Sequence, residues 1–461
     1  MNDEIRMTND DLPDGWATCE IGEISPVIGG GTPPSKNPHN FTDKGGIPWI
    51  TPADLSGYSE MFISRGKRNL TERGFSESSA RMLPKGALLF SSRAPVGYVA
   101  IASNPVCTNQ GFKSFILPEG FDSRFGYFYL RHIKPLAEAR ATGTTFKELS
   151  GGAASHLPFN VAPLSEQRRI ADKLEAVLGR VDACRTRLDR IPALLKRFRQ
   201  SVLAAATSGH LTAEWRMANG LDDEWESAEL GSLIADGPKN GLYKSSTCYG
   251  QGTRILRIDN FYAGYISSWE GLKRLTVSEA ELEDFSLAVG DIVVNRVNSM
   301  SHLGKSALVR DLPEPCVFES NMMRLRLDIE RISPQFCILV LTSQNGIEQL
   351  QQNAKQAVNQ ASINQTDVKA VIVSLPSLPE QQEIVRRVEA LIAIADRIEV
   401  RLATAHKTVE RLTPATLAKA FRGELIPQDP NDESASVLLE RIREERESFR
   451  NPRKRNPSIK V

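Results

Sequence analysis

The residues best placed for phosphate chemistry are Gly304, Lys305 and Ser306. They follow a strand-like run from 291 to 297, and a strand followed by a glycine-rich turn ending in Gly-Lys-Ser is typical of a phosphate-binding loop. That loop needs another glycine five positions before Gly304, where this chain has Ser299. We therefore predict a strand–turn–strand connection here, with Lys305 free to touch a phosphate.

Other motifs of catalysis or cofactor binding are missing from the sequence. The glycine-rich run from 29 to 33 leads into prolines, whereas a dinucleotide-binding loop opens a helix. It predicts a flexible loop, or a backbone that approaches a ligand closely. There is no His-Glu-x-x-His, no Gly-x-Ser-x-Gly, no Asn-Pro-Pro-Tyr or Asp-Pro-Pro-Tyr of amino-methyltransferases, and no two-carboxylate motif. We expect no catalytic residue, metal site or cofactor site in this chain.

The cysteines are scattered singly, at positions 19, 107, 184, 248, 316 and 337, and the histidines do not cluster near them. Because zinc sites need closely spaced ligand pairs, we expect free thiols and a reducing cytoplasm rather than a zinc site. No run of 18 apolar residues occurs, and the polar, acidic first 11 residues are unlike a signal peptide.

The charged residues almost balance, with 57 Lys and Arg against 56 Asp and Glu, so any nucleic-acid surface must be local. Several loops combine small polar residues with Lys or Arg. Asn, Gln, Ser, Thr and Arg read base edges, while Lys and Arg hold phosphates. For any one loop, a solvated surface loop is the alternative interpretation. The candidate DNA-contacting residues are Lys36, Ser92, Arg93, Lys113, Thr144, Thr145, Lys147, Lys239, Lys244, Arg296, Asn298, Lys305, Gln360 and Ser362.

The elements that position these loops occur twice, because the chain contains an internal repeat. The segment from 163 to 211 matches the segment from 377 to 425 at an offset of 214 residues. Glu166 then corresponds to Glu380, Gln167 to Gln381, and Gly209 to Gly423. A repeat of this length predicts two copies of one structural unit.

Both matched segments have the pattern of a long helix, since their apolar residues recur at alternating steps of four and three. Ser165 fits an N-cap, Pro379 the first helical position, and the two glycines fit helix stops, while Pro192 predicts a kink or a short break. We expect the helices to pair with each other; the alternative is that each packs only on its own domain. The predicted seam residues are Ile170, Leu174, Val177, Val181, Cys184, Leu188, Ile191, Leu195, Phe198 and Val202, and then Ile384, Val388, Leu391, Ala395, Ile398, Leu402, Ala405, Val409, Leu412 and Thr416.

The stretches before the helices also correspond, more loosely; Leu12–Trp16, for example, is similar to Leu221–Trp225. The run from Met323 to Ile329 alternates apolar and charged residues, which predicts a half-buried strand. The predicted fold is therefore α+β, with two similar, strand-rich mixed modules separated by two long antiparallel helices that form a coiled coil. The expected boundaries are 1–162 for module 1, 163–210 for the first helix, 211–376 for module 2, 377–427 for the second helix and 428–461 for a helical, basic tail, whose end we expect to be disordered.

Two modules, each followed by a long helix that opens with Pro-Leu-Ser-Glu-Gln or Leu-Pro-Glu-Gln, resemble the specificity subunit of type I restriction–modification enzymes. The segments 191–200 and 418–425 are similar to that family's helix ends. The resemblance covers roughly residues 12–427 and is most specific in the helices. It implies that each module is a target recognition domain, binding one half of a two-part site in double-stranded DNA. The helices would hold the modules at a fixed distance and so set the gap between half-sites.

The resemblance also implies partners. Two methyltransferase (modification) subunits would dock on the helices, and restriction/translocase subunits would join them. S-adenosylmethionine, ATP and magnesium would bind to those partners, and no cofactor to this chain. Two other classes of protein stay open: a non-catalytic coiled-coil adaptor that binds protein partners, and an enzyme with an unrecognised site in the modules.

Overall fold

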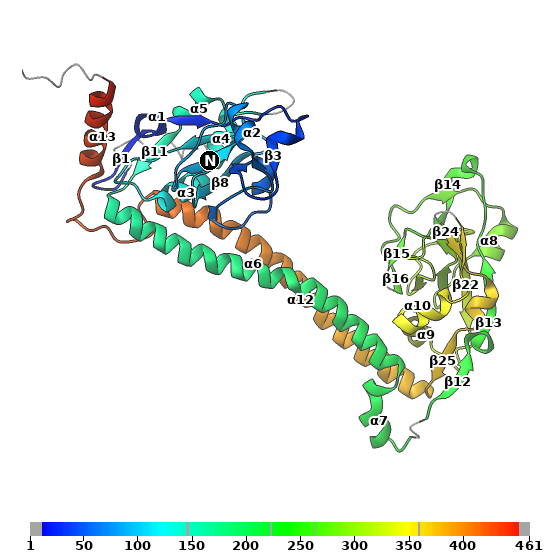
Figure 1. Ribbon diagram of the computed structural model, residues 1–461. Coiled ribbons are helices and arrows are strands. Elements are labelled where there is room, and N and C mark those ends of the chain that lie inside the picture. Colours follow the sequence, from blue (N-terminus) through cyan, green and yellow to red (C-terminus); the bar gives the residue numbers. More distant parts are fainter. Residues whose placement is uncertain (1–11, 144–146, 222–223, 263, 358–359, 451–461) are drawn as a thin grey trace, which may run out of the picture. The chain divides into compact units, whose positions relative to one another are not determined.

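The computed structural model describes residues 12–143, 147–221, 224–262, 264–357 and 360–450. These residues form two compact units. Unit 1 contains residues 1–187 and 405–461, and unit 2 contains residues 188–404. Both long helices pass from one unit into the other, so each unit contains part of both helices (Figure 1).

Module 1 lies in unit 1 and is built on a five-stranded sheet with the order β2-β10-β7-β8-β5. A four-stranded sheet, β3-β6-β4-β9, and the pair β1-β11 complete it. The strands are β1 (Ala17–Glu20), β2 (Val27–Gly29), β3 (Phe41–Thr42), β4 (Ile47–Ile50), β5 (Phe62–Ile63), β6 (Asn69–Leu70), β7 (Leu88–Ser92), β8 (Val96–Ala102), β9 (Cys107–Thr108), β10 (Lys113–Phe115) and β11 (Pro158–Val161). The helices are α1 (Ile21–Ile24), α2 (Glu72–Ser76), α3 (Ser123–His132), α4 (Lys134–Arg140) and α5 (Gly151–Ser155).

Module 2 lies in unit 2 and repeats this plan. Its main sheet has the order β13-β22-β18-β20-β16-β15, beside the sheets β17-β14-β21 and β19-β24-β23 and the pair β12-β25. The strands are β12 (Glu226–Glu229), β13 (Ile234–Asn240), β14 (Tyr249–Leu256), β15 (Phe261–Tyr262), β16 (Gly264–Ile266), β17 (Arg274–Leu275), β18 (Ile292–Asn295), β19 (Val297–Asn298), β20 (Ser306–Leu308), β21 (Cys316–Phe318), β22 (Met322–Leu327), β23 (Lys355–Ala357), β24 (Gln360–Ser362) and β25 (Ile372–Leu375). The helices are α7 (Ala213–Ala218), α8 (Glu279–Phe285), α9 (Pro334–Thr342), α10 (Gln344–Gln351) and α11 (Gln365–Lys369).

The two main sheets confirm the predicted repeat, because five strands follow each other in the same order. β2, β10, β7, β8 and β5 correspond to β13, β22, β18, β20 and β16. The fifth strands of the two series, β5 and β16, both pair in parallel with their neighbours β8 and β20. Module 2 adds β15 at this edge of its sheet. The segment around Lys305 is the predicted strand–turn–strand connection, joining β18 and β19 to β20.

One strand is more buried than its alternation predicted. In β22, Met323 and Leu325 are fully buried as expected, but Arg324 on the opposite face is buried too. Its guanidinium donates to Asp236 at 2.8 Å and to the Ser286 carbonyl at 2.8 Å. The alternating pattern cannot reveal that Arg324 is buried, because the sequence does not distinguish an arginine that is paired inside the protein from one that is exposed. Ile329 lies beyond the end of the strand and is exposed.

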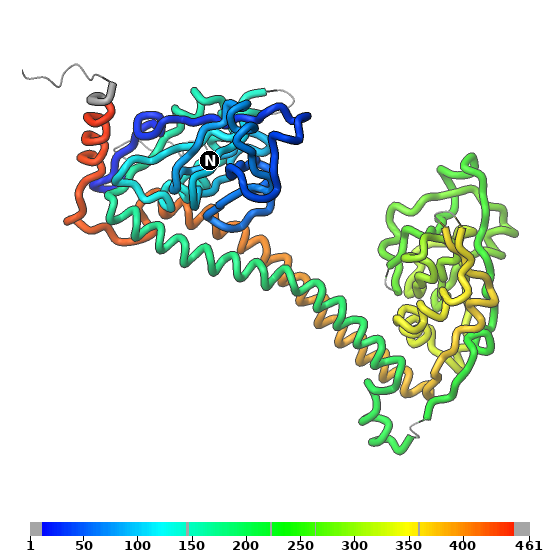
Figure 2. The backbone as a smooth tube through the Cα atoms, in the orientation of Figure 1, coloured from blue at the N-terminus to red at the C-terminus, as the bar shows by residue number. Residues whose placement is uncertain are grey.

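The matched segments form two 44-residue helices, α6 (Leu164–Thr207) and α12 (Leu378–Phe421). The two helices run side by side in opposite directions (Figure 2). Gly209 and Gly423 follow the helix ends at φ values of +81° and +72°, the left-handed conformation of a helix stop. α6 continues through Pro192, so the break considered for that position does not occur. Ser165 lies in the first turn of α6 rather than at its N-cap.

Within each unit, one heptad series of the predicted seam is consistently covered. Leu174, Val181, Leu195 and Val202 of α6 are buried, as are Val388, Ala395, Leu402 and Val409 of α12, and Leu188 of the same series is half-buried. The other series begins with buried Ile170 and Ile384, continues with half-buried Val177 and Leu391, and then reaches the surface. Its exposed members, which depart from the predicted seam, are Cys184, Phe198, Ile398 and Leu412.

The helix ends are anchored in the module cores. In unit 1, the Phe421 ring of α12 lies 5.3 Å from Phe125 and 4.9 Å from Tyr129, centre to centre. In unit 2, Val202 of α6 and Ile384 of α12 share a core with Phe336. A further helix, α13 (Ala435–Arg450), adds buried Leu438, Leu439 and Ile442 to the core of module 1 (Figure 1). The basic end of the predicted tail lies outside the described residues.

Candidate nucleic-acid interface

In module 2, four candidate DNA-contacting residues meet on one small sheet. β19 pairs with β24, placing Val297 opposite Ser362 and Asn298 opposite Ala361, and β24 continues the hairpin with β23. Arg296 precedes β19 and receives the Ile363 amide on its carbonyl at 2.9 Å. Gln360 is exposed, while Arg296, Asn298 and Ser362 are half-buried. The arrangement brings together an arginine, an asparagine and a glutamine, side-chain types that pair with base edges. The Arg296 guanidinium also donates to the Ser320 carbonyl at 3.1 Å.

Module 1 has the equivalent edge at the end of β7. Arg93 forms an isolated bridge with Glu148, as does Thr142, and the Ser92 carbonyl accepts the Leu149 amide at 2.9 Å. The Glu148 carboxylate lies 3.4 Å from the Arg93 guanidinium and 3.5 Å from the Lys113 ammonium. Sequence reasoning named both loops, but only the backbone pairing brings Ser92 and Arg93 together with Glu148 and Leu149, which follow the second loop.

The candidate DNA-contacting residues of module 1 differ in how exposed their side chains are. The Ser92 side chain is fully buried, with no hydrogen-bond partner for its hydroxyl among the described residues. It cannot reach a base from this position, so Ser92 is not among the proposed DNA contacts. Lys36 and Lys147 are exposed. Thr144 and Thr145 lie outside the described residues.

Three lysines of module 2 are engaged by the protein itself. The ammonium groups of Lys239 and Lys244 each lie 2.6 Å from a carboxylate, of Asp284 and Glu281 respectively. Both carboxylates belong to α8. A phosphate would have to compete with them.

Lys305, expected to be free, is the third. Its ammonium donates to the Ile258 carbonyl at 3.1 Å and lies 3.8 Å from the centre of the Tyr262 ring. Burial lowers the pKa of this ammonium, with Asp259 opposing the shift. A phosphate contact would require this side chain to leave its aromatic neighbour.

Gly30 allows the glycine-rich loop to pack against the protein's own backbone. A Cβ at Gly30 would come within 2.1 Å of the Asn109 carbonyl oxygen and 2.2 Å of the Thr108 carbonyl oxygen. The absence of a side chain therefore allows two backbone segments to lie together, which fits the close-approach interpretation with the protein itself in place of a ligand.

The repeated Glu-Gln pair, recognised in the sequence only as a match, ties each helix start to its module. The Glu166 carboxylate accepts the Trp16 indole N–H at 3.0 Å, and the Glu380 carboxylate accepts the Trp225 indole N–H at 3.2 Å. Gln167 donates to the Ala162 carbonyl at 2.8 Å, and Gln381 donates to the Pro376 carbonyl at 2.9 Å. The alignment of Leu12–Trp16 with Leu221–Trp225 contained the signal that could have identified these contacts.

The amide oxygens of the same glutamines mark equivalent positions in the two modules. The Asp122 amide donates to Gln167 at 3.0 Å, and the Ser333 amide donates to Gln381 at 2.8 Å. Asp122 and Ser333 are the N-caps of α3 and α9. Residues of α3 therefore correspond to residues of α9 at an offset of 211.

The two buried glutamates differ in their neutralisation. Glu380 also accepts the Arg216 guanidinium at 2.6 Å and the Thr212 hydroxyl at 2.7 Å. Glu166 has no such cation in contact, and one of its carboxylate oxygens has no hydrogen-bond partner among the described residues. Burial raises the pKa of Glu166, against the opposing effects of Trp16 and Arg169.

Three further features of the described part of the chain concern metal ligands, thiols and membrane spans. No group of three or more His, Cys, Asp or Glu side chains there could hold a metal ion. All six cysteines are free. Among the described helices, none has the length and apolar character needed to cross a bilayer.

Comparison with protein families gives one match, to the type I restriction modification DNA specificity domain, which covers residues 13–193 and again 223–404. The chain is 33% identical to the type I restriction enzyme StySPI specificity subunit of Salmonella potsdam, over 95% of this chain and 97% of that protein. It is 30% identical to the EcoKI specificity subunit of Escherichia coli K12, over 94% of this chain and 96% of that protein.

Solved structures share the fold. A chain from a study of the assembly and conformational transition of the type I R-M system matches with a TM-score of 0.67 and 19% identity, over 90% of this chain and 99% of that chain. The HsdS subunit from Thermoanaerobacter tengcongensis matches with a TM-score of 0.59 and 21% identity, over 90% of this chain and 98% of that chain.

Proposed function

Because the chain belongs to the type I restriction modification DNA specificity family, as a non-catalytic DNA-specificity subunit with two target recognition domains, we propose that each module reads one half of a bipartite DNA site. The reading elements are the paired edges, β19-β24 with Arg296 in module 2 and the equivalent edge at Arg93 in module 1. One observation carries this assignment: the same edge recurs in both modules with different side chains.

The side chains at the two edges suit different contacts. Arginine pairs with the O6 and N7 atoms of guanine, and asparagine or glutamine with the N6 and N7 atoms of adenine. Module 2 offers Arg296, Asn298 and Gln360 for this purpose. Module 1 offers Arg93 with Lys113 and Lys147, a more cationic set. Lys36, Lys239 and Lys244 are the proposed phosphate contacts, which position a protein on DNA without reading its sequence.

The helices α6 and α12 are the proposed docking surface for two methyltransferase subunits. Leu194 and Phe198 of α6, and Ile394 and Ile398 of α12, are exposed apolar residues spaced four apart, so each pair lies on one helix face. Arg199 forms ion pairs with Asp396 and Glu399, which brings Phe198 level with Ile398. Exposed apolar residues gathered in this way are typical of an interaction surface.

The remaining assignments follow from the proposed assembly. Restriction/translocase subunits would join the complex, S-adenosylmethionine, ATP and magnesium would bind to the partners, and the length of the helices would set the gap between half-sites. The free cysteines support a location in the cytoplasm.

Methylation mapping tests the proposal directly. The chain is expressed with its methyltransferase partner, and N6-methyladenine is located by long-read sequencing of the host DNA. We expect one bipartite motif that disappears when this chain is deleted. No motif, in a complex shown to contain both proteins, would favour an adaptor that binds protein partners only.

Paired variants assign the half-sites. Arg296→Ala with Gln360→Ala should relax one half of the motif, at a cost of about 1–3 kcal/mol per lost base contact, and Arg93→Ala should affect only the other half. Lys273→Ala, an exposed change in module 2 away from the hairpin, is the control. A motif that keeps both halves in all variants would contradict the proposed reading edges.

A further inference from the structure

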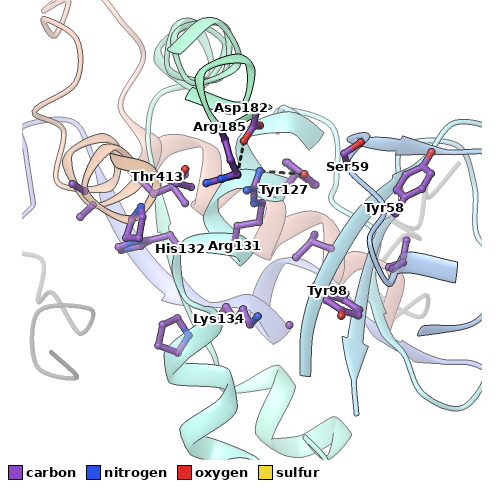
Figure 3. Close-up of a pocket in the computed structure, with 18 of the residues that line it drawn as sticks. Tyr58, Ser59, Tyr98, Tyr127, Arg131, His132, Lys134, Asp182, Arg185 and Thr413 are labelled. Atoms are coloured by element: carbon purple, nitrogen blue, oxygen red, sulfur yellow. Dashed lines mark hydrogen bonds and ion pairs between the residues drawn. The ribbon is translucent and has the colours of Figure 1, made fainter. Parts of the chain in front are cut away.

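A cavity of about 1020 Å³ lies within unit 1, where module 1 meets the helices. β8, α3 and α4 line it from the module, and α6 and α12 from the helices. Figure 3 shows Tyr58 and Tyr98 at one side and Arg131, Arg185 and Thr413 toward the other. A cavity of this size can hold a ligand as large as a cofactor.

The cavity is lined by cations in excess. Arg131, Lys134, Arg185 and Arg422 contribute to its wall, whereas Asp182 is its one lining carboxylate and pairs with Arg185 at 2.8 Å. Glu138 and Glu424, just outside the lining, pair with Lys134 and Arg422 and reduce the excess.

Arg131 is the cation at the centre of this wall. It donates to the Tyr127 hydroxyl at 3.3 Å and lies 5.4 Å from the centre of that ring. Among the described residues, no carboxylate forms an ion pair with it. The neighbouring His132 adds no charge near neutral pH, because burial, helped by Arg422, lowers its pKa to about 4. Arg131 is therefore available to an anionic ligand.

The repeat shows that this cationic wall belongs to one half of the chain only. At the offset of 214, Asp182, Arg185 and Thr413 correspond to Asp396, Glu399 and Arg199. In unit 2, Arg199 bridges Asp396 at 2.6 Å and Glu399 at 2.7 Å, which closes the equivalent position with an ion-pair network. In unit 1, a threonine replaces that arginine and an arginine replaces that glutamate, so no such bridge forms.

The charged lining residues that come from module 1 also have no charged counterparts in module 2. At the offset of 211 fixed by the glutamine contacts, Arg131, His132 and Lys134 correspond to Thr342, Ser343 and Asn345. Module 2 has only uncharged side chains at these positions. An occupant drawn by the cations would therefore bind once per chain. Two identical subunits that dock on the two repeats would need the same lining in both repeats. The cationic lining occurs in one repeat only, so it does not fit such a pair of subunits.

We propose that the cavity binds one nucleoside polyphosphate, with its base against Tyr58 and Tyr98 and its phosphates toward Arg131 and Arg185. Arginine binds phosphate oxygens through paired N–H donors, and tyrosine rings stack on bases. The site is a binding site without catalytic groups. It does not depend on the proposed DNA-reading edges, because none of their reading residues lines the cavity.

The test is a titration of the purified full chain with a fluorescent ATP analogue, followed by competition with unlabelled ATP, adenosine and tripolyphosphate. We expect saturable binding at one site per chain. Arg131→Gln combined with Arg185→Gln should weaken it at least about 10-fold, because the double change removes the charged hydrogen-bond donors to the phosphates. Tyr98→Ala should weaken ATP binding and leave tripolyphosphate binding unchanged.

Two controls keep the result interpretable. Arg180→Gln removes an exposed arginine from the same helix outside the cavity and should not alter binding. Unchanged thermal unfolding of every variant shows that the fold is intact. The proposal is overturned by a lack of saturable ATP binding, or by equal binding in the double variant.

DNA is the other source of bases and phosphates, and a second arm distinguishes it. Duplex and single-stranded oligonucleotides are titrated against the same variants. If the double variant loses oligonucleotide affinity but not ATP affinity, the cavity belongs to the DNA path and the nucleotide site is rejected. A DNA motif that is unchanged in the double variant, together with lost ATP binding, separates this site from the reading of the target sequence.

Discussion

At the scale of single residues, the two copies of the buried glutamate keep the same hydrogen bond but differ in what their charge contributes to the stability of the fold. Both carboxylates accept an indole N–H from a matched tryptophan, but only Glu380 is also paired with an arginine. A buried charge is costly unless it is paired and hydrogen-bonded. The two helix starts should therefore respond oppositely to removal of the charge.

Replacing Arg216 by methionine should destabilise the second helix start strongly. The guanidinium and the Glu380 carboxylate are 8% and 2% exposed, so the change leaves a buried charge without its partner, at a cost of roughly 3–5 kcal/mol. Urea unfolding followed by circular dichroism measures the effect. Arg310→Met, which breaks an ion pair between half-exposed side chains, is the matched control and should shift stability by less than about 1 kcal/mol. Equal effects would contradict the buried ion pair.

Replacing Glu166 by glutamine should have a pH-dependent effect of the opposite sign. Burial raises the pKa of this carboxyl above its ordinary value of 4.5, so the folded state binds its proton more tightly than the unfolded state does. The native contribution is favourable to folding at low pH and is lost as pH rises from 4.5 through the folded pKa. The Gln variant keeps an acceptor for Trp16 and carries no charge.

The stability of Glu166→Gln relative to the natural chain should therefore rise as pH increases from about 4.5 through the folded pKa of Glu166, and then level off. Thermal unfolding across this range measures it, with Glu380→Gln as the comparison, since that change weakens a buried ion pair and should destabilise at neutral pH. A difference for Glu166→Gln that stays constant with pH would show that this carboxyl is not perturbed.

At the scale of elements, the helices pack mainly through every seventh residue. Leu402, a member of the covered series, is buried, whereas Ile398 of the alternate series is 39% exposed. A full coiled coil buries both series. The half-open seam therefore leaves apolar side chains exposed on both helices, as the proposed docking surface requires.

Leu402→Ala and Ile398→Ala should separate these roles. The buried leucine should cost about 2–4 kcal/mol on truncation, because it leaves a cavity, and the exposed isoleucine less than about 1 kcal/mol. Chemical denaturation of both variants is the measurement. Similar losses at the two positions would mean that both series are packed alike.

Phe198→Asp combined with Ile398→Asp should leave the folded chain intact but abolish its co-purification with the methyltransferase. Val400→Asp is the control, because Val400 is also exposed but lies two residues from Ile398, about 200° around the helix. Undiminished capture of the partner by the double variant would remove the helices from the docking surface.

At the scale of the whole molecule, two continuous helices connect two recognition modules that share one strand order. A helix rises about 1.5 Å per residue, so each 44-residue helix is roughly 66 Å long. One turn of B-DNA is about 34 Å. The helices are therefore long enough to act as a ruler between half-sites.

Inserting one heptad into both α6 and α12 tests the ruler. The insertion adds roughly 10.5 Å of helix, close to the rise of three base pairs, and keeps the seam in register. Methylation mapping should show the same two half-sites with a longer gap. An unaltered gap would exclude the helices as the spacer. Exchange of residues 12–160 for another module should change one half-site only.

The sequence alone determined the repeat, the two long helices with their glycine stops and the α+β class, because periodicity and matched motifs are local properties of the chain. It could not decide that Ser92 and Arg324 are buried, that Lys305 is held by Tyr262, or that Ile398 lies at the surface. Nor could it show that Glu148 pairs with Arg93, or that a cationic cavity forms beside α6 in unit 1. These features depend on which distant segments meet, and only the tertiary packing decides whether a polar side chain finds a protein partner or is left for a ligand.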